Sequence, residues 1–484
     1  MVTARRPCPP APGPLEAYAA CFDDLFASLA QRRGFREYLT GLLAPRDRHK
    51  TLTALAGAEP ITQAQHPAVQ RLQFFLSEST WDPDQVNARR LRLLLDDPAT
   101  APHSGGVLVI DDSGDRKYGT ATAHVGHQWL GRWGKTENCV VTVSTLWADE
   151  HLYYPLHALP YTPAHHFTRG RVDPDFRTKP QLAAELVRQA LTLPVACAAV
   201  VADCAYGDNE EFRVELRRTG LPYVVALKPH KGSWAREMDP HTPIDAARRL
   251  SWNGLEDPRD WTAVTRRFRD GHTECWWAAD ATLAGWGPDR PTRLVVVTTD
   301  PACLPEKTTW YLTTDLPCPG SRHAAGCPHR VATYAEIVRL YGLRTWVEQG
   351  YKQLKDELGW ADFQVRSDVA IRRHQVLVCC AFSFCWGQWL IETISRPGPA
   401  VVCTTDSAVA QADVGERGDR GRPSARPAVV AAGPAGHPQL ADPGDHAATL
   451  VASLVEYAPT GAVTSSPRRR RRRSGAVPVP STLS

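Results

Sequence analysis

The N-terminal part of the chain has apolar residues at a helical spacing. In LEAYAACFDDLFASLAQ and again in VQRLQFFLSEST, apolar residues recur every three or four positions, with arginines among the polar positions of the region. This period is that of amphipathic α-helices with one face buried. The pattern therefore predicts an N-terminal helical domain over residues 15–100.

Two short apolar runs further along the chain each end at an acidic residue. Residues 107–110 lie between glycines and Asp111–Asp112, and residues 195–202 run into Asp203. Such runs are typical of strands buried on both faces. We therefore expect two strands that each deliver a carboxylate at the strand end. An amphipathic helical pattern follows Asp203, which indicates an α/β unit.

The segments around these two runs complete a second predicted domain, residues 101–394. Residues 138–161 are rich in β-branched and aromatic residues, which predicts one or two strands paired with the first. Residues 180–193 have a helical pattern. Residues 228–314 have strand-like periodicity and many tryptophans, and we interpret them as an inserted β-rich subdomain.

Two helices are predicted to close the folded part, one over residues 334–358 and one over residues 371–394. The longest apolar stretch, residues 376–390, is interrupted by polar residues and glycine and is shorter than the roughly 20 residues of a membrane span. We expect a buried core helix there and no contact with a membrane. From residue 395 to 484 the composition shifts to Pro, Gly, Ala and Arg, which predicts a disordered tail.

Composition narrows the class of protein without indicating its chemistry. A chain of 484 residues has room for two or three folded units, and 43% hydrophobic with 22% charged residues is ordinary for a soluble globular protein. The net charge is only +4. Thirteen cysteines, an odd number, in a chain whose N-terminus has no secretory pattern favour reduced thiols in the cytoplasm.

The predicted helix over residues 334–358 has an unusual polar stripe. At about 100° per residue, Tyr341, Arg344, Glu348 and Lys355 project within an arc of about 60°. An acid between two cations and a phenol suits a metal ligand beside groups that hold phosphate. The alternative is a solvated face with an Arg344–Glu348 pair at i, i+4. A glutamate that faces two strand-end aspartates would supply what a pair of divalent ions needs.

Three sequence blocks resemble one known family. The spacing Y-x2-R-x3-E-x6-K in YGLRTWVEQGYKQLK resembles the YREK signature of bacterial insertion-sequence transposases of the DDE superfamily. VLVIDDSGDRKYG resembles the strand that carries the first aspartate of that family, and VVADCAYGDN resembles the strand and turn of the second. The blocks occur in the order of the family.

The resemblance implies a role for each matching residue. Asp111, Asp203 and Glu348 would be the catalytic, metal-binding acids, and Asp111 fits the first position because Ser113 supplies the hydroxyl two residues later. Asp112 remains the alternative for that position. Four further residues would contact the phosphates of DNA: Tyr341, Arg344, Lys352 and Lys355.

The resemblance also implies an architecture and a reaction. We expect an RNase H-like α/β fold, with a mixed sheet flanked by helices and the β-rich insertion before the glutamate helix, and DNA-end binding by residues 15–100. Two Mg²⁺ or Mn²⁺ ions would support cleavage and strand transfer at terminal inverted repeats, joining them to target DNA. A homodimer on double-stranded DNA, at the nucleoid in the cytoplasm, is implied. The alternatives are an RNase H-like nuclease without strand transfer, or a decayed transposase that only binds DNA.

Overall fold

The computed structural model describes residues 7–58, 65–232, 236, 238–268 and 271–395. The tail for which the sequence predicts disorder, from residue 396 on, lies outside the described residues. Five helices form the N-terminal part, as predicted. They are α1 (Leu15–Ala20), α2 (Leu29–Leu43), α3 (Leu52–Leu55), α4 (Pro67–Ser77) and α5 (Pro83–Asp96), with a 3-10 turn at Asp23–Leu25.

Local sequence explains where the longer of these helices begin. Ser28 and Gln31 form a reciprocal capping box at the start of α2. Asp82 accepts a hydrogen bond from the backbone of Asp84 at the start of α5, where Pro83 occupies the first helical position. Each cap satisfies backbone N–H groups that have no partner within the helix.

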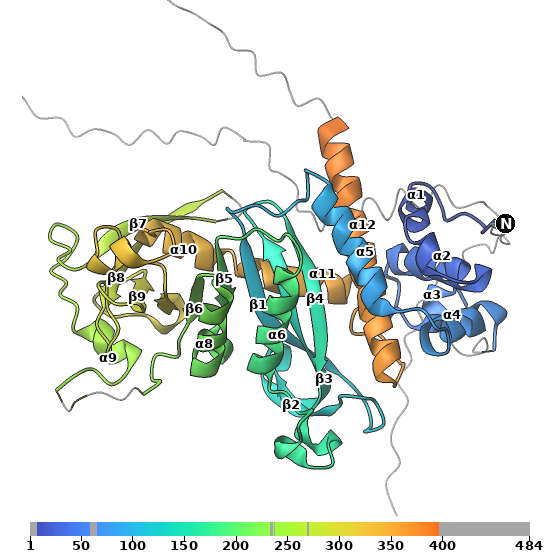
Figure 1. Cartoon of the computed structure of the whole chain (residues 1–484), viewed down its shortest axis with the longest axis horizontal. Helices are drawn as coiled ribbons and strands as arrows, with labels where there is room; N and C mark the ends of the chain where they lie inside the picture. Colours follow the sequence, from blue (N-terminus) through green and yellow to red (C-terminus); the bar gives the residue numbers. More distant parts are fainter. Residues whose placement is uncertain (1–6, 59–64, 233–235, 237, 269–270, 396–484) are drawn as a thin grey trace, which may run out of the picture.

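A ten-stranded sheet forms the centre of the molecule (Figure 1). Its strands run in the order β2-β3-β1-β5-β6-β10-β9-β8-β7, and β4 also pairs with β3. The strands are β1 (Val107–Arg116), β2 (Gly126–Leu130), β3 (Lys135–Ala148), β4 (Tyr153–Tyr161), β5 (Ala199–Ala202), β6 (Tyr223–Ala226), β7 (Thr262–Arg267), β8 (Thr273–Ala281), β9 (Arg293–Thr298) and β10 (Thr309–Thr314).

The sheet is mixed, as an RNase H-like fold requires. β1 pairs antiparallel with β3 and parallel with β5, and β5 pairs parallel with β6. The β-rich insertion before the glutamate helix is confirmed, and it continues the same sheet, because β10 pairs antiparallel with β6. The carboxylate-bearing strands β1 and β5 are therefore neighbours near the middle, with strands on both sides.

Helices cover both faces of the sheet (Figure 1). α6 and α8 pack together on one face, with α6 against β3 and β4. α10 and α11 lie on the other face, α10 over β5 and β6 and α11 over β1 and β4. The bounds are α6 (Lys179–Leu191), α7 (Cys204–Gly207), α8 (Glu210–Thr219), α9 (Pro243–Arg248), α10 (Tyr334–Gly342), α11 (Thr345–Asp356) and α12 (Asp368–Ser395).

The last helix, α12, joins the N-terminal helices to the sheet. It packs against α2, α4, α5 and β4, and the Tyr38 hydroxyl lies 2.7 Å from Nδ1 of His374 in this contact. Among the described residues α12 is the one helix long and apolar enough, by length and composition, to cross a membrane. Most of that stretch is buried inside the protein, which agrees with the predicted core helix.

Two predicted boundaries were wrong. β1 does not end before its acids but continues to Arg116, because β3 pairs with it through the whole polar segment. The single helix predicted over residues 334–358 is two helices, α10 and α11. At the junction the amides of Arg344, Trp346 and Val347 bond to carbonyls three residues back, a 3-10 pattern that interrupts the α-helix.

A buried arginine in α5 connects three elements. The Arg90 guanidinium donates to the carbonyls of Pro155 and Leu156 in β4 at 2.9 and 2.8 Å, and to the Ser383 hydroxyl in α12 at 3.1 Å. It also donates to Asn87 Oδ1 within α5. Since Arg90 is fully buried, removing it would take one donor from each of these acceptors, of which the Leu156 carbonyl would keep its bond from Asn87.

We therefore expect Arg90→Leu to lower the free energy of unfolding by about 3 kcal/mol, the cost of losing several buried hydrogen bonds at once. Arg92→Leu, at an exposed position of the same helix, is the control and should change it by less than about 0.5 kcal/mol. Urea denaturation measures both. Equal effects of the two substitutions would contradict the role of Arg90 in holding α5 to β4 and α12.

Candidate active site

Asp111 and Asp112 lie next to each other within β1 and point to opposite faces of the sheet, as alternation along a strand requires. Asp112 accepts from Lys179 Nζ at 2.8 Å and from the Tyr206 hydroxyl at 3.0 Å, on the side of α6. Asp111 faces Arg344, which precedes α11. Asp111 is therefore the acid on the side of the glutamate helix, and Asp112 is held by partners on the other side.

Asp203 directly follows β5 and caps the short helix α7. Its Oδ1 accepts from the backbone N–H of Ala205 at 2.9 Å. In the parallel pairing of β1 with β5, Ile110 is opposite Ala202. Asp111 and Asp203 therefore follow paired residues, which brings the two carboxylates to the same part of the sheet.

One guanidinium contacts all three predicted catalytic acids. Arg344 Nη2 lies 3.6 Å from Asp111 Oδ2 and 3.7 Å from Asp203 Oδ2. Its Nη1 lies 3.2 Å from Glu348 Oε1, one turn further along α11. The three acids, far apart in sequence and carried by two strands and a helix, thus converge on one group.

Burial and like charge perturb the first of these acids. Burial raises the pKa of Asp111 to about 7, with Asp203 and Asp112 adding to the rise and the Arg344 cation opposing it. Burial alone would lower the pKa of Arg344, but Asp111, Tyr341, Asp203 and Glu348 together raise it above its ordinary value. The site therefore favours a positive charge among its carboxylates.

The chemistry of these donors fits a divalent cation. Carboxylate oxygens are the ligands that Mg²⁺ and Mn²⁺ prefer. In the part of the chain that the structure describes, no three His, Cys, Asp or Glu side chains already form a metal-binding group. At Asp111, Asp203 and Glu348 the guanidinium of Arg344 contacts the carboxylate oxygens, so a metal held by these oxygens would have to displace it.

The four predicted phosphate contacts lie in different surroundings. Lys352 is exposed. The ring of Tyr341 is largely buried against Trp310, with 5.0 Å between the ring centroids, and Arg344 faces the acids. Lys355 is buried, and its ammonium lies 2.7 Å from Asp115 Oδ1. In this position Lys355 is not available to a phosphate.

Several residues that position α11 were not recognised in the sequence. Asp115, on the same face of β1 as Asp111, pairs with Lys355, which also donates to the Gly114 carbonyl at 2.8 Å. The Tyr351 hydroxyl lies 2.6 Å from Ser144 Oγ. Alternation along β1 would have indicated Asp115 had the full length of the strand been predicted.

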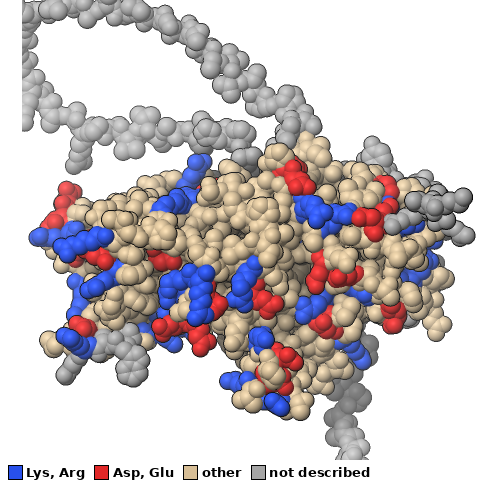
Figure 2. All heavy atoms as spheres, viewed as in Figure 1, with Lys and Arg blue, Asp and Glu red and all other residues tan. Residues whose placement is uncertain are grey.

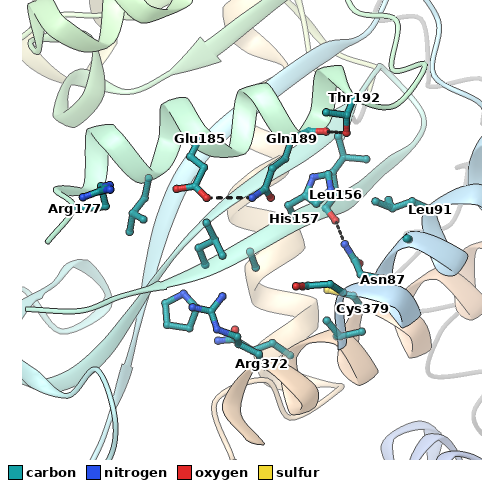
Figure 3. A pocket seen from close by; sticks show the side chains of 18 of the residues that line it. Asn87, Leu91, Leu156, His157, Arg177, Glu185, Gln189, Thr192, Arg372 and Cys379 are labelled. Carbon is teal, nitrogen blue, oxygen red and sulfur yellow. Dashed lines mark hydrogen bonds between the residues drawn. The ribbon is translucent and has the colours of Figure 1, made fainter. Parts of the chain in front are cut away.

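A separate cavity of about 620 Å³ lies between α6, β4, α5 and α12 (Figure 3). His157 and Glu185 are among its lining residues, and Asn87 donates to the Leu156 carbonyl at its edge. Burial lowers the pKa of His157 to about 4. None of the three predicted catalytic acids lines this cavity, so it is distinct from the candidate active site.

Comparison with known proteins agrees with this geometry. Residues 21–279 match the family described as "DDE superfamily endonuclease", and residues 175–384 match the family described as "Transposase DDE domain". The chain is similar to a protein of Microchaete diplosiphon named "Probable transposase for insertion sequence element IS701". The two are 29% identical over 361 residues, which cover 74% of this chain and 84% of the relative.

The pKa of Asp111 predicts a pH-dependent stability of the metal-free protein. Its folded value of about 7 exceeds the ordinary value of 3.8, so the native state holds this proton more tightly. The resulting stability is full below pH 4 and is lost as the pH rises to 7. In chelator at pH 8, Asp111→Asn should be more stable than the wild type by at most about 4 kcal/mol.

Thermal denaturation between pH 4 and pH 8 measures this difference, which should shrink toward pH 4. Asp112→Asn is the matched control and should not stabilise, because it weakens the contact with Lys179. An Asp111→Asn protein less stable than the wild type at pH 8 would contradict the account of the site.

The Asp115–Lys355 pair predicts a stability effect that a surface lysine would not have. Lys355→Met leaves a buried carboxylate without its partner and should cost about 3–5 kcal/mol. Adding Asp115→Leu should restore most of this, while Lys352→Met, at an exposed position, should cost little. If Lys355→Met instead folds as stably as the wild type, the ion pair does not hold α11.

Proposed function

The chain belongs to the DDE superfamily of endonucleases and is a transposase, and from this premise we propose that Asp111, Asp203 and Glu348 catalyse cleavage and strand transfer of DNA at insertion-sequence ends. The observation that carries the proposal is the convergence of the three carboxylates on Arg344. Acids gathered around a single cation form a site that can exchange that cation for metal.

Two divalent ions, Mg²⁺ or Mn²⁺, held by the three carboxylates would activate water or a 3′-hydroxyl as nucleophile and stabilise the leaving oxygen. The chain prepares for this in two ways. Asp203 is oriented by its hydrogen bond to the backbone of α7. Burial raises the pKa of Asp111 to about 7, so its ligand oxygens are mostly free of a proton only above neutral pH.

Arg344 would have two positions in this scheme. Without metal it neutralises the acids, and with metal bound its guanidinium moves to the phosphates of the DNA, which its planar fork fits. Lys352, exposed on α11, would add a further phosphate contact, and Tyr341 would line the approach. Lys355 would act indirectly. Its ion pair with Asp115 would hold α11, and with it Glu348, in place over β1.

The remaining parts of the chain would serve DNA recognition. Residues 15–100 would bind the terminal inverted repeats. The catalytic domain would then join these ends to target DNA, with two copies of the chain on the double-stranded substrate. Such a protein would act in the cytoplasm at the nucleoid.

Glu348→Gln tests the catalytic role directly. The substitution keeps size and hydrogen bonding but removes a charge that would hold metal. Cleavage of an end-containing duplex in Mg²⁺ should fall by about two orders of magnitude or more, while binding to the same duplex persists. Glu357→Gln, exposed just beyond α11, is the control. A Glu348→Gln protein that nicks DNA at the normal rate would rule out the assignment.

Arg344→Gln should separate the two roles of the arginine. Removing the cation from among the acids should strengthen Mn²⁺ binding by the free protein, which titration calorimetry measures. Binding to DNA should weaken by about tenfold, with a shallower dependence on salt, because a phosphate contact is lost. Unchanged Mn²⁺ affinity would show that Arg344 does not compete with metal.

A further inference from the structure

The hairpin of β2 and β3 extends beyond the end of β1. β1 pairs with β3 as far as Cys139, and from there to the tip β3 pairs with β2. Leu130, the last residue of β2, packs back on Cys139 and Val141 near the base in a small separate core and lies against Gly114 of β1. The tip is a 3-10 turn, Gly131–Trp133, followed by Gly134 in the left-handed region. The hairpin is thus a short ribbon with a fixed base.

Large aromatic rings are exposed on this ribbon. Trp129 is 63% exposed and Trp133 is 54% exposed, and Tyr118, just after β1, is 86% exposed. The Arg116 guanidinium lies 5.2 Å from the Tyr118 ring centroid and 5.8 Å from that of Trp133. These rings expose apolar surface to water beside a guanidinium. Stacking on a partner would cover this surface.

The cations of the ribbon are held only by exposed ion pairs. Arg132 lies 3.2 Å from Asp356 at the end of α11, and Lys135 lies 2.6 Å from Glu137. Arg116 also reaches Glu137, at 3.6 Å. Exposed pairs of this kind contribute little, so these cations can exchange their carboxylates for phosphate.

We propose that the β2–β3 hairpin is a DNA-binding ribbon that enters a groove of the duplex cleaved at the active site. A two-stranded ribbon fits the major groove, Trp129 and Trp133 would contact sugars and bases, and Arg132 would contact phosphate. Over the face seen in Figure 2, charge alone does not indicate where DNA binds, because Lys and Arg alternate with Asp and Glu. The inference rests on the proposed function, since it names a further contact for the same DNA.

The strand pairing places this contact to one side of the acids. Asp111 is opposite Ser144 in β3, and Trp129 is opposite Thr136, eight residues earlier in β3. Leu130, next to Trp129, packs back against Gly114 and Val141, so the ribbon curls toward β1. The ribbon should therefore contact the duplex to one side of the cleaved phosphate.

The double variant Trp129→Ala, Trp133→Ala tests this in the full chain. Anisotropy with an end-containing duplex in chelator should show binding weakened about tenfold or more, the loss expected for one aromatic contact with DNA. The melting temperature should not change, since both rings are exposed. In a missing-nucleoside interference experiment, the double variant should lose part of the wild-type signal outside the cleaved position.

Two further variants serve as controls. Val331→Ala, also at an exposed apolar position, should leave binding unchanged. Glu137→Gln removes the carboxylate that competes with phosphate for Arg116 and Lys135, so binding should strengthen, which damage to the fold would not cause. Unchanged or weaker binding by Glu137→Gln would overturn the proposed exchange of carboxylate for phosphate.

These experiments distinguish an error in the proposed DNA-binding ribbon from an error in the proposed enzymatic function. If the wild type neither binds nor cuts end-containing DNA, the proposed function is wrong and the ribbon with it. If the wild type cuts and the double variant binds equally well, only the ribbon is wrong. A double variant with unchanged DNA affinity but a smaller oligomer in sedimentation would make the hairpin a contact between copies, which also overturns the proposal.

Discussion

Three carboxylates lie close together in the active site, and the local structure depends on a positive charge among them. Asp111 lies in the middle of the sheet, where burial opposes its ionisation, and Asp203 follows the neighbouring strand. Arg344 contacts both of these acids and Glu348. In the proposed function a divalent metal would take the place of this cation, with the donor oxygens already held together.

The frame around these acids is fixed by other contacts. β1 pairs with β5 as far as Ile110 and with β3 through Asp111, so the backbone of Asp111 has little freedom. α11 is held by the Asp115–Lys355 pair and by stacking of Trp346 on Tyr153, whose ring centroids are 4.5 Å apart. Glu348, by contrast, has a side chain that is 70% exposed. The backbone thus limits the aspartates more than the side chain of Glu348, which would be able to adjust to metal and DNA in the proposed function.

Sequence patterns predicted the fold class and the elements that carry the acids. Helical periodicity indicated the N-terminal helices, and two apolar runs indicated β1 and β5, because strands buried on both faces need apolar side chains at every position. The end of β1 was misplaced because a polar segment can remain in a sheet when each side chain has a partner, as Asp112 has in Lys179 and Asp115 in Lys355.

Helical spacing predicted that four side chains share one face of a helix: Tyr341, Arg344, Glu348 and Lys355. It did not predict which groups that face contacts. The break before α11 and the pairing of Lys355 with Asp115 depend on tertiary contacts that local spacing does not encode. The choice between Asp111 and Asp112 likewise needed the position of Arg344 across the sheet. The catalytic roles of the acids and the contacts with DNA stay predictions.

Iron-directed cleavage of the protein tests the central claim most directly. Fe²⁺ bound in place of Mg²⁺ produces hydroxyl radicals in the presence of ascorbate and peroxide, and these cut the backbone close to the ion. The account predicts cuts near Asp111, Asp203 and Glu348, suppressed by excess Mg²⁺ and weakened in Glu348→Gln. Cuts confined to other segments, or a pattern near these three residues that Glu348→Gln leaves unchanged, would contradict a shared metal site.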